Sequence, residues 1–258
     1  MPRPSIDECR ARLSACDPAD LEELLASLEC DPRAGVRTLA ATHRRASAAS
    51  DAESARLFGL MGHQLRLHAE GMRLVAGVDE VGRGALAGPL TLAAVVLPAE
   101  SRIIGLDDSK RLSPARREIV ASLVREDAVA LSIVHIGPSE VDAVGIREAV
   151  RIGMERAVQA LRVRVDHVLV DGNDARLTLP ATAVVGGDHL CACIAAASVV
   201  AKVTRDALMR KLAPDYPEFG FEVNKGYGTP EHLEALVRCG PSPHHRRSFG
   251  PCAQPPLF

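Results

Sequence analysis

The hydrophobic residues in the larger, C-terminal part of the chain form short runs separated by turn residues. Two runs rich in Val, Leu and Ala lie within residues 74–98, with glycines and Pro89 between them. Runs of this length, bounded by Gly and Pro, predict two neighbouring strands. The same pattern predicts three further strands, at residues 128–136, 165–170 and 181–185.

Helical patterns lie between and after the later strands. Ser113-Pro114 predicts the start of a helix that ends near Arg125, because Ser caps helices and Pro fits their first turn. Residues 138–161 and 190–212 also have a helical pattern, and the second stretch is rich in Ala. We therefore expect an α/β fold, in which a mixed five-stranded sheet has helices on its faces.

The first 70 residues have leucines at helical spacing and almost no strand signal. Asp17-Pro18 and Asp31-Pro32 predict helix starts, with Asp as the cap and Pro at the first position. Residues 46–51 predict a loop. We expect a helical N-terminal extension over residues 1–70 and a main domain over residues 71–258 that ends in a helical segment.

The composition is that of a globular protein, with 258 residues of which 47% are hydrophobic. No apolar run approaches the ~18 residues that span a bilayer, which predicts no membrane partner. The N-terminus also lacks the apolar core of a secretory signal. The sequence thus predicts a soluble, cytoplasmic protein.

The seven cysteines form no Cys-x-x-Cys pair, and their odd number argues against a full disulfide framework. Cys191 and Cys193 are close in sequence, but within a helix their side chains would point in different directions. We expect the cysteines to act as small hydrophobic residues in a reducing compartment.

Acidic residues stand at the ends of three predicted strands. Asp79 and Glu80 end the first strand, while Asp171 and Asp188 end the fourth and fifth. Each has an ordinary alternative explanation, since Asp171 suits a turn and Asp188 suits a helix cap. Four such acids beside glycines favour a common site. They converge only if their strands are neighbours in the sheet, which the pattern leaves open.

Carboxylate oxygens in this number favour Mg²⁺ or Mn²⁺ over zinc, because no His or Cys lies beside them at ligand spacing. Four acids can hold two cations ~3.5–4 Å apart, and such a pair activates water for in-line attack on a phosphodiester. The net charge is only −2, so a nuclease would concentrate positive charge locally. The candidate cations are Arg83, Lys110, Lys202 and Arg205.

The helix over residues 190–212 carries three polar side chains on one face. Ser198, Lys202 and Arg205 are spaced i, i+4, i+7, which could hold phosphates. The alternative is a solvated face on which Lys202 pairs with Asp206.

The glycines after the first strand also suggest a dinucleotide-binding loop. Their spacing does not fit that motif, and Pro89 with the following strand leaves no helix N-terminus for a pyrophosphate. Asp79 and Glu80 would repel it as well. The sequence argues against a nicotinamide-dependent enzyme.

Six sequence blocks together resemble bacterial ribonuclease HII, in the family's order and spacing over roughly residues 72–250. The blocks are Asp79-Glu80-Val81-Gly82-Arg83-Gly84 with Ala87-Gly88-Pro89, Asp107-Asp108-Ser109-Lys110, Val170-Asp171-Gly172, Gly187-Asp188, the run from Ala196 to Asp206, and Lys225-Gly226-Tyr227-Gly228-Thr229-Pro230 with His232. The tail around His245 to Phe249 is also similar to the family's ending.

The resemblance implies a ribonuclease H-like fold and an endonuclease that cuts the RNA strand of RNA–DNA hybrids and 5′ of ribonucleotides embedded in duplex DNA. It implies 3′-hydroxyl and 5′-phosphate products and two Mg²⁺ or Mn²⁺ ions. The implied metal ligands are Asp79, Glu80, Asp171 and Asp188.

The same resemblance implies how the substrate is bound. The segment Gly82-Arg83-Gly84 would read the ribose 2′-hydroxyl, and Tyr227 would pack on the neighbouring sugar. The further candidates for substrate binding are Lys110, Ser198, Lys202 and Arg205. One departure is Gly186, which stands where many relatives have Lys, and its lack of charge would weaken phosphate contact near Asp188.

Two other functions stay open at this point. One is a catalytically silent nucleic-acid-binding module, against which the four acids argue. The other is the related ribonuclease that cuts hybrids but not a lone ribonucleotide, against which the complete Gly82-Arg83-Gly84 segment argues. We expect a monomer and leave any docking partner unspecified.

Overall fold

The computed structural model describes residues 3–253, and the larger of its two compact units is built around a mixed sheet of five strands. The strand order is β3-β2-β1-β4-β5. Pairing is antiparallel among β1, β2 and β3, and parallel among β1, β4 and β5, which confirms the predicted mixed sheet. The strands are β1 (Val75–Val81), β2 (Leu90–Val96), β3 (Ala130–Ile136), β4 (His167–Asp171) and β5 (Ala181–Val184).

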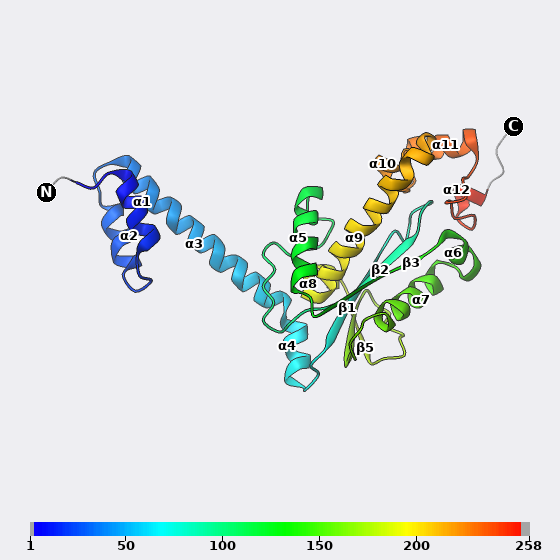
Figure 1. The fold of residues 1–258 in the computed structure, drawn as a ribbon, viewed down its shortest axis with the longest axis horizontal. Coiled ribbons are helices and arrows are strands. Elements are labelled where there is room, and N and C mark those ends of the chain that lie inside the picture. Colours follow the sequence, from blue (N-terminus) through cyan, green and yellow to red (C-terminus); the bar gives the residue numbers. More distant parts are fainter. Residues whose placement is uncertain (1–2, 254–258) are drawn as a thin grey trace. The chain divides into compact units, whose positions relative to one another are not determined.

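Helices cover both faces of this sheet (Figure 1). The first face carries α4 (Gly62–Ala69), α5 (Pro114–Asp127) and α9 (Ala192–Leu212). The second carries α6 (Pro138–Val144) and α7 (Ile146–Gln159). The remaining helices of this part are α8 (Gly187–Leu190), α10 (Phe221–Asn224), α11 (Pro230–Cys239), α12 (Gly250–Ala253), and the 3₁₀ turns Ala213–Asp215 and Pro217–Phe219.

The predicted helix start at Ser113-Pro114 is confirmed, and both of its sequence signals act in the structure. Ser113 is the N-cap of α5, its hydroxyl accepts a hydrogen bond from the Arg116 N–H at 3.3 Å, and Pro114 stands in the first turn. This arrangement satisfies an N–H group that the helix itself cannot pair.

The packing of α9 on β1 depends on small residues. A Cβ atom placed on Gly77 would lie 2.2 Å from the carbonyl carbon of Cys193. The facing part of α9 is an Ala-rich run, so the two backbones can approach closely. Gly77 is therefore required by the distance between strand and helix.

The prediction for the Cys191 and Cys193 side chains is wrong. Cys191 is not helical but extended, at the N-cap of α9, and its Sγ atom lies 3.5 Å from the Sγ atom of Cys193. Because an extended residue precedes the helix, the two side chains turn to the same side. All seven cysteines are free thiols.

The chain divides into two compact units between Arg56 and Leu57. The first contains α1 (Ile6–Ala15), α2 (Leu21–Glu29) and most of α3 (Ala34–Leu60). Its small core consists of buried side chains from these three helices, namely Cys9, Leu13, Leu25, Leu28, Val36 and Ala40. Within residues 3–253, none of the helices is long and apolar enough to cross a membrane.

Three predictions for the N-terminal residues are wrong. Asp17 and Asp31 each accept an N–H two residues onward, from Ala19 at 2.9 Å and Arg33 at 2.8 Å. These are turns that precede the helices, which begin only at Leu21 and Ala34. The predicted loop at residues 46–51 lies inside α3, because its alanines favour a helix.

The contact between Gly77 and α9 makes the Gly77→Ala variant a test of this packing. We expect the free energy of unfolding to fall by about 2 kcal/mol, since the added methyl meets backbone atoms. Urea denaturation measures this change. The control is Gly59→Ala in α3, where a Cβ meets nothing within 4 Å and a gain of roughly 0.5–1 kcal/mol is expected. Equal effects of the two substitutions would contradict the assignment.

Candidate active site

Two acidic strand ends lie side by side because β1 and β4 are parallel neighbours. Their pairing continues to Val78 and Val170, and the next residues along the two strands are Asp79 and Asp171. Neighbouring strands are ~4.8 Å apart, which brings these two carboxyl groups to one edge of the sheet. The structure therefore settles the neighbour relation that the sequence pattern left open.

The other two acids reach the same place by different routes. Glu80 follows Asp79 in β1, so its side chain projects from the opposite face of the sheet. Asp188 lies in α8, and its backbone N–H donates a hydrogen bond to Asp171 Oδ1 at 3.4 Å. All four predicted carboxylates are thus grouped around the ends of β1 and β4.

Burial and mutual repulsion act on three of these carboxyl groups. Burial raises the pKa of Asp79 well above its ordinary value, and the charges of Glu80 and Asp171 add to the rise. Burial also raises the pKa values of Glu80 and Asp171, the latter with a contribution from Asp188. Crowded, poorly solvated carboxylates of this kind are stabilised by a bound cation.

Asp188 differs from the other three because two basic groups touch it. Lys110 Nζ donates a hydrogen bond to its Oδ2 at 2.7 Å, and His189 Nδ1 lies 3.1 Å from its Oδ1. Burial by itself would raise the pKa of Asp188, but these contacts outweigh it and the pKa is lowered. Lys110 therefore supplies the positive charge beside Asp188. Gly186, which stands where many relatives have Lys, carries no charge and has a left-handed backbone conformation with φ +68°.

The donor set fits a hard divalent cation by its chemistry. All four candidate ligands offer carboxylate oxygens, which Mg²⁺ and Mn²⁺ prefer. In the conformation described for residues 3–253, no three His, Cys, Asp or Glu side chains are already arranged to hold a metal ion. Asp188 is turned to Lys110, and Glu80 lies 3.5 Å from Arg83. Binding of an ion by all four would require these side chains to turn.

A cavity of about 390 Å³ opens beside the carboxylates. Asp79, Glu80 and Asp171 line it. Of the predicted substrate-binding residues, all except Arg205 line it too, namely Gly82, Arg83, Gly84, Lys110, Ser198, Lys202 and Tyr227. Segments far apart in the sequence therefore meet around one space that adjoins the acids.

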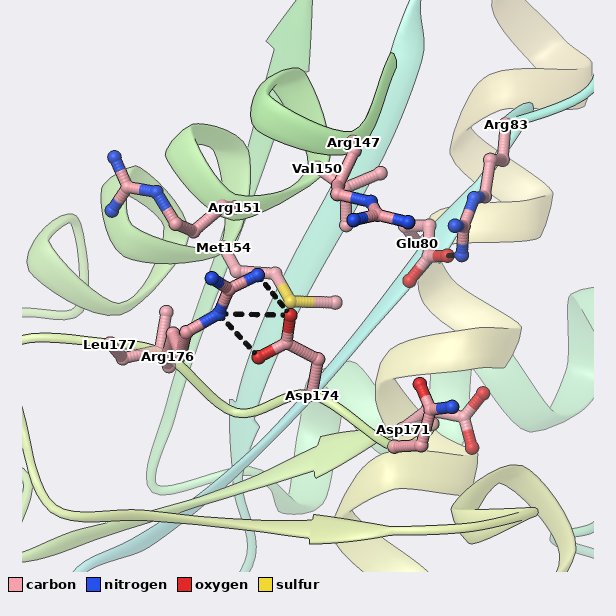
Figure 2. A pocket seen from close by; sticks show the side chains of 12 residues that line it. Glu80, Arg83, Arg147, Val150, Arg151, Met154, Asp171, Asp174, Arg176 and Leu177 are labelled. Atoms are coloured by element: carbon pink, nitrogen blue, oxygen red, sulfur yellow. Dashed lines mark hydrogen bonds and ion pairs between the residues drawn. The ribbon is translucent and has the colours of Figure 1, made fainter.

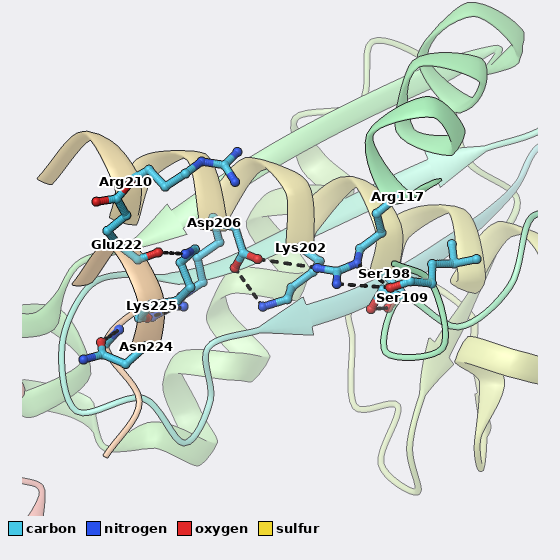
Figure 3. A network of polar contacts seen from close by, with 12 residues as sticks. Ser109, Arg117, Ser198, Lys202, Asp206, Arg210, Glu222, Asn224 and Lys225 are labelled. Atoms are coloured by element: carbon cyan, nitrogen blue, oxygen red, sulfur yellow. Dashed lines mark hydrogen bonds and ion pairs between the residues drawn. The ribbon is translucent and has the colours of Figure 1, made fainter. Parts of the chain in front are cut away.

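The polar side chains of α9 make contacts within the protein. Lys202 Nζ donates a hydrogen bond to Asp206 at 2.8 Å, which confirms the predicted pairing, and Arg117 lies 3.5 Å from the same carboxylate (Figure 3). Lys202 nevertheless lines the cavity. Ser198 is buried, and its hydroxyl lies 2.9 Å from that of Ser109.

Known proteins of one family are similar to this chain over most of its length. Residues 76–252 match the family Ribonuclease HII, and residues 5–63 match the Ribonuclease HII N-terminal domain. The chain is 46% identical to the ribonuclease HII of Geobacillus kaustophilus over 224 residues, which cover 87% of this chain and 86% of that protein. The chain belongs to the ribonuclease HII family.

Further comparisons agree with this ribonuclease HII assignment. The ribonuclease HII of Xanthomonas campestris is 52% identical over 182 residues, which cover 69% of this chain and 76% of that protein. The crystal structure of ribonuclease H2 from Pyrococcus horikoshii superposes with a TM-score of 0.63 at 29% identity, covering 70% of this chain and 95% of that one. The chain is thus a metal-dependent type 2 ribonuclease H that acts on RNA–DNA hybrids and embedded ribonucleotides.

The prediction that Arg205 binds substrate is wrong, because the structure does not bring its side chain to the cavity of this ribonuclease HII. Its side chain is fully buried. The guanidinium group donates hydrogen bonds to the carbonyls of Pro89 at 2.8 Å, Lys225 at 2.9 Å and Ala87 at 3.0 Å. Its donors hold two loops together, so they are not available to a substrate phosphate.

A second buried arginine with a similar arrangement, Arg246, was missed by the sequence analysis. It donates hydrogen bonds to the Arg83 carbonyl at 3.0 Å and to the Gly88 carbonyl at 3.1 Å. Burial lowers the pKa of Arg246 to about 10, and the nearby charge of Arg205 contributes. The sequence signal for Arg246 was its place in the C-terminal tail that resembles the family's ending. Its hydrogen-bond partners could be found only from the fold.

The two glycines of the Gly82-Arg83-Gly84 segment have different environments. Gly82 has φ +88°, and a Cβ atom there would lie 2.2 Å from Arg205 Nε. Around Gly84, a Cβ atom would meet nothing within 4 Å. Gly82 is thus required by the fold, while the space at Gly84 is open.

The three carbonyl contacts of Arg205 make Arg205→Met a test of its structural role. We expect the free energy of unfolding to fall by about 3 kcal/mol, because the carbonyls lose a buried charged donor. Thermal and urea denaturation measure the change. Arg210→Met, an exposed change on the same helix, serves as the control. Unchanged stability together with weakened duplex binding would instead restore the phosphate-binding role.

Proposed function

We propose that this chain hydrolyses the phosphodiester bond on the 5′ side of a ribonucleotide, in RNA–DNA hybrids and in duplex DNA. The products would be a 3′-hydroxyl and a 5′-phosphate. The observation that carries the proposal is the convergence of Asp79, Glu80 and Asp171, with raised pKa values, in one cavity with the Gly82-Arg83-Gly84 segment.

Asp79, Glu80, Asp171 and Asp188 would hold two Mg²⁺ or Mn²⁺ ions. When bound, such ions supply charge stabilisation for a phosphodiester and lower the pKa of water. Among the described residues that line the cavity there is no His or Cys, and Ser198 and Ser109 contact each other. Water is therefore the proposed nucleophile. Lys110 would leave Asp188 for a substrate phosphate as the ions bind.

Selection of the ribose would rest on the backbone of Gly82, Arg83 and Gly84. The 2′-hydroxyl distinguishes RNA from DNA, and a backbone without side chains can approach it closely. Tyr227 lines the same cavity, and the Arg205 guanidinium lies over its ring at 5.3 Å from the centroid. This contact would hold the ring in place for packing against a sugar.

The proposed substrates are RNA–DNA hybrids and ribonucleotide-containing duplex DNA. We expect a cytoplasmic monomer, and a light-scattering measurement of the purified protein would test the oligomeric state.

Replacing one carboxylate tests the proposed metal site. Asp79→Asn keeps the size of the side chain but removes an anionic ligand, so turnover of a singly ribo-substituted duplex should fall by roughly 10³-fold or more. Duplex binding measured in Ca²⁺ should survive. The control is Asp215→Asn at an exposed 3₁₀ turn. Retained turnover at saturating Mg²⁺ would count decisively against the assignment.

The open space at Gly84 allows ribose reading to be tested without damage to the fold. Gly84→Ala should lower kcat/KM for a duplex with one ribonucleotide by about tenfold or more, equivalent to ~1.4 kcal/mol. Half-saturation by Mg²⁺ should stay unchanged, because the carboxylates are untouched. Gly62→Ala, also in open space, is the control. Unchanged cleavage by Gly84→Ala would refute the backbone role.

A further inference from the structure

A second cavity, of about 360 Å³, adjoins the carboxylates on the α7 face of the sheet (Figure 2). It shares Glu80, Arg83 and Asp171 with the cavity described above. The two cavities therefore adjoin at these three residues. Four of the twelve residues that line the second cavity are arginines, namely Arg83, Arg147, Arg151 and Arg176.

Three arginines that the proposed mechanism does not use line this space. Arg147 and Arg151 come from the first two turns of α7, and Arg176 comes from the segment between β4 and β5. Arg151 pairs with Glu148 and Arg176 pairs with Asp174, each at 2.6 Å. Both pairs are exposed or nearly so, where an ion pair contributes little and exchanges readily for another anion.

The side chain of Arg147 forms no hydrogen bond or ion pair in the part of the chain that the structure describes. Its charge acts on the Asp174 carboxylate of the same cavity, whose pKa is lowered mainly by the hydrogen bond from Arg176 and also by Arg147. Figure 2 places its guanidinium on the side of the cavity nearest Glu80 and Arg83. It lies in the first turn of α7, where the helix dipole disfavours a cation. The helix dipole therefore gives no reason for an arginine at this position, whereas the negative charge of Asp174 and of an anion bound in the cavity would stabilise it.

The order of the two cavities along a substrate strand follows from the proposed chemistry. The ribose-reading segment and Tyr227 lie in the first cavity, and the ribonucleotide is on the 3′ side of the bond that is cut. Glu80 and Asp171 line both cavities, whereas Tyr227 and the two glycines of the ribose-reading segment line only the first. A strand that continues past the two shared carboxylates in the 5′ direction would enter the second cavity, beside Arg147 and Arg176.

We propose that Arg147 and Arg176 bind backbone phosphates of the cleaved strand on the 5′ side of the scissile bond. This inference rests on the proposed function and adds a substrate subsite to it. Arginine matches a phosphate with two parallel N–H donors, and Arg176 would exchange Asp174 for the phosphate. Contacts of this kind fix the position of a strand without reading its sequence.

The experiment compares Arg147→Ala, Arg176→Ala and the double variant with Arg156→Ala. Arg156 lies on the same helix and pairs with Glu140 at 2.7 Å, but it does not line the cavity. On a duplex with one ribonucleotide, the double variant should raise KM by about tenfold and leave kcat within about twofold. The slope of log affinity against log salt should fall by roughly one for each phosphate that the variant no longer binds.

Shortened substrates locate the bound phosphates. When the cleaved strand is cut back on the 5′ side of the scissile bond, the parent and the double variant should become equal in KM. When it is cut back on the 3′ side, the difference should persist. A parent enzyme that leaves the single-ribonucleotide duplex uncut would overturn the proposed function. A parent that cleaves it, with the double variant indistinguishable from Arg156→Ala or its defect retained on 5′-shortened substrates, would overturn this subsite alone.

Discussion

Parallel pairing of β1 with β4 is the constraint on which the rest of this molecule depends. The register that pairs Val78 with Val170 makes Asp79 and Asp171 the next residues on adjacent strands. These strands are far apart in sequence, and only a crossover connection between them permits a parallel arrangement. That connection runs through β2, β3 and the α7 face, so it also builds the wall that carries Arg147.

Grouping the carboxylates has an electrostatic cost, which nearby cations partly offset. Burial raises the pKa of Asp79, whereas Lys110 holds that of Asp188 below its ordinary value. The three acids on the sheet, Asp79, Glu80 and Asp171, therefore favour binding of protons or cations, whereas Asp188 of α8 is already paired with Lys110. Divalent ions bound at such a site would lower this electrostatic cost.

Loops at the site are held by buried arginines rather than by regular structure. Arg205 joins the segment after Gly84 to the loop that carries Tyr227, and Arg246 binds the Arg83 carbonyl. Both side chains are fully buried among backbone carbonyls. A reading of Arg205 from its spacing on α9 predicted a phosphate contact, because helical periodicity identifies a shared face but not what covers that face.

The sequence by itself determined the strands, the helix that begins after Ser113 and the mixed sheet, because these follow from local patterns and recognisable blocks. It also pointed to four acids, whose role as metal ligands stays a prediction. It did not determine helix starts near Asp17 and Asp31, where a side-chain turn competes with a cap. Only the tertiary structure decided that Asp79 and Asp171 are neighbours, that Arg205 faces inward and that arginines line a second cavity. Such facts depend on strand order and packing between distant segments, which no local pattern encodes.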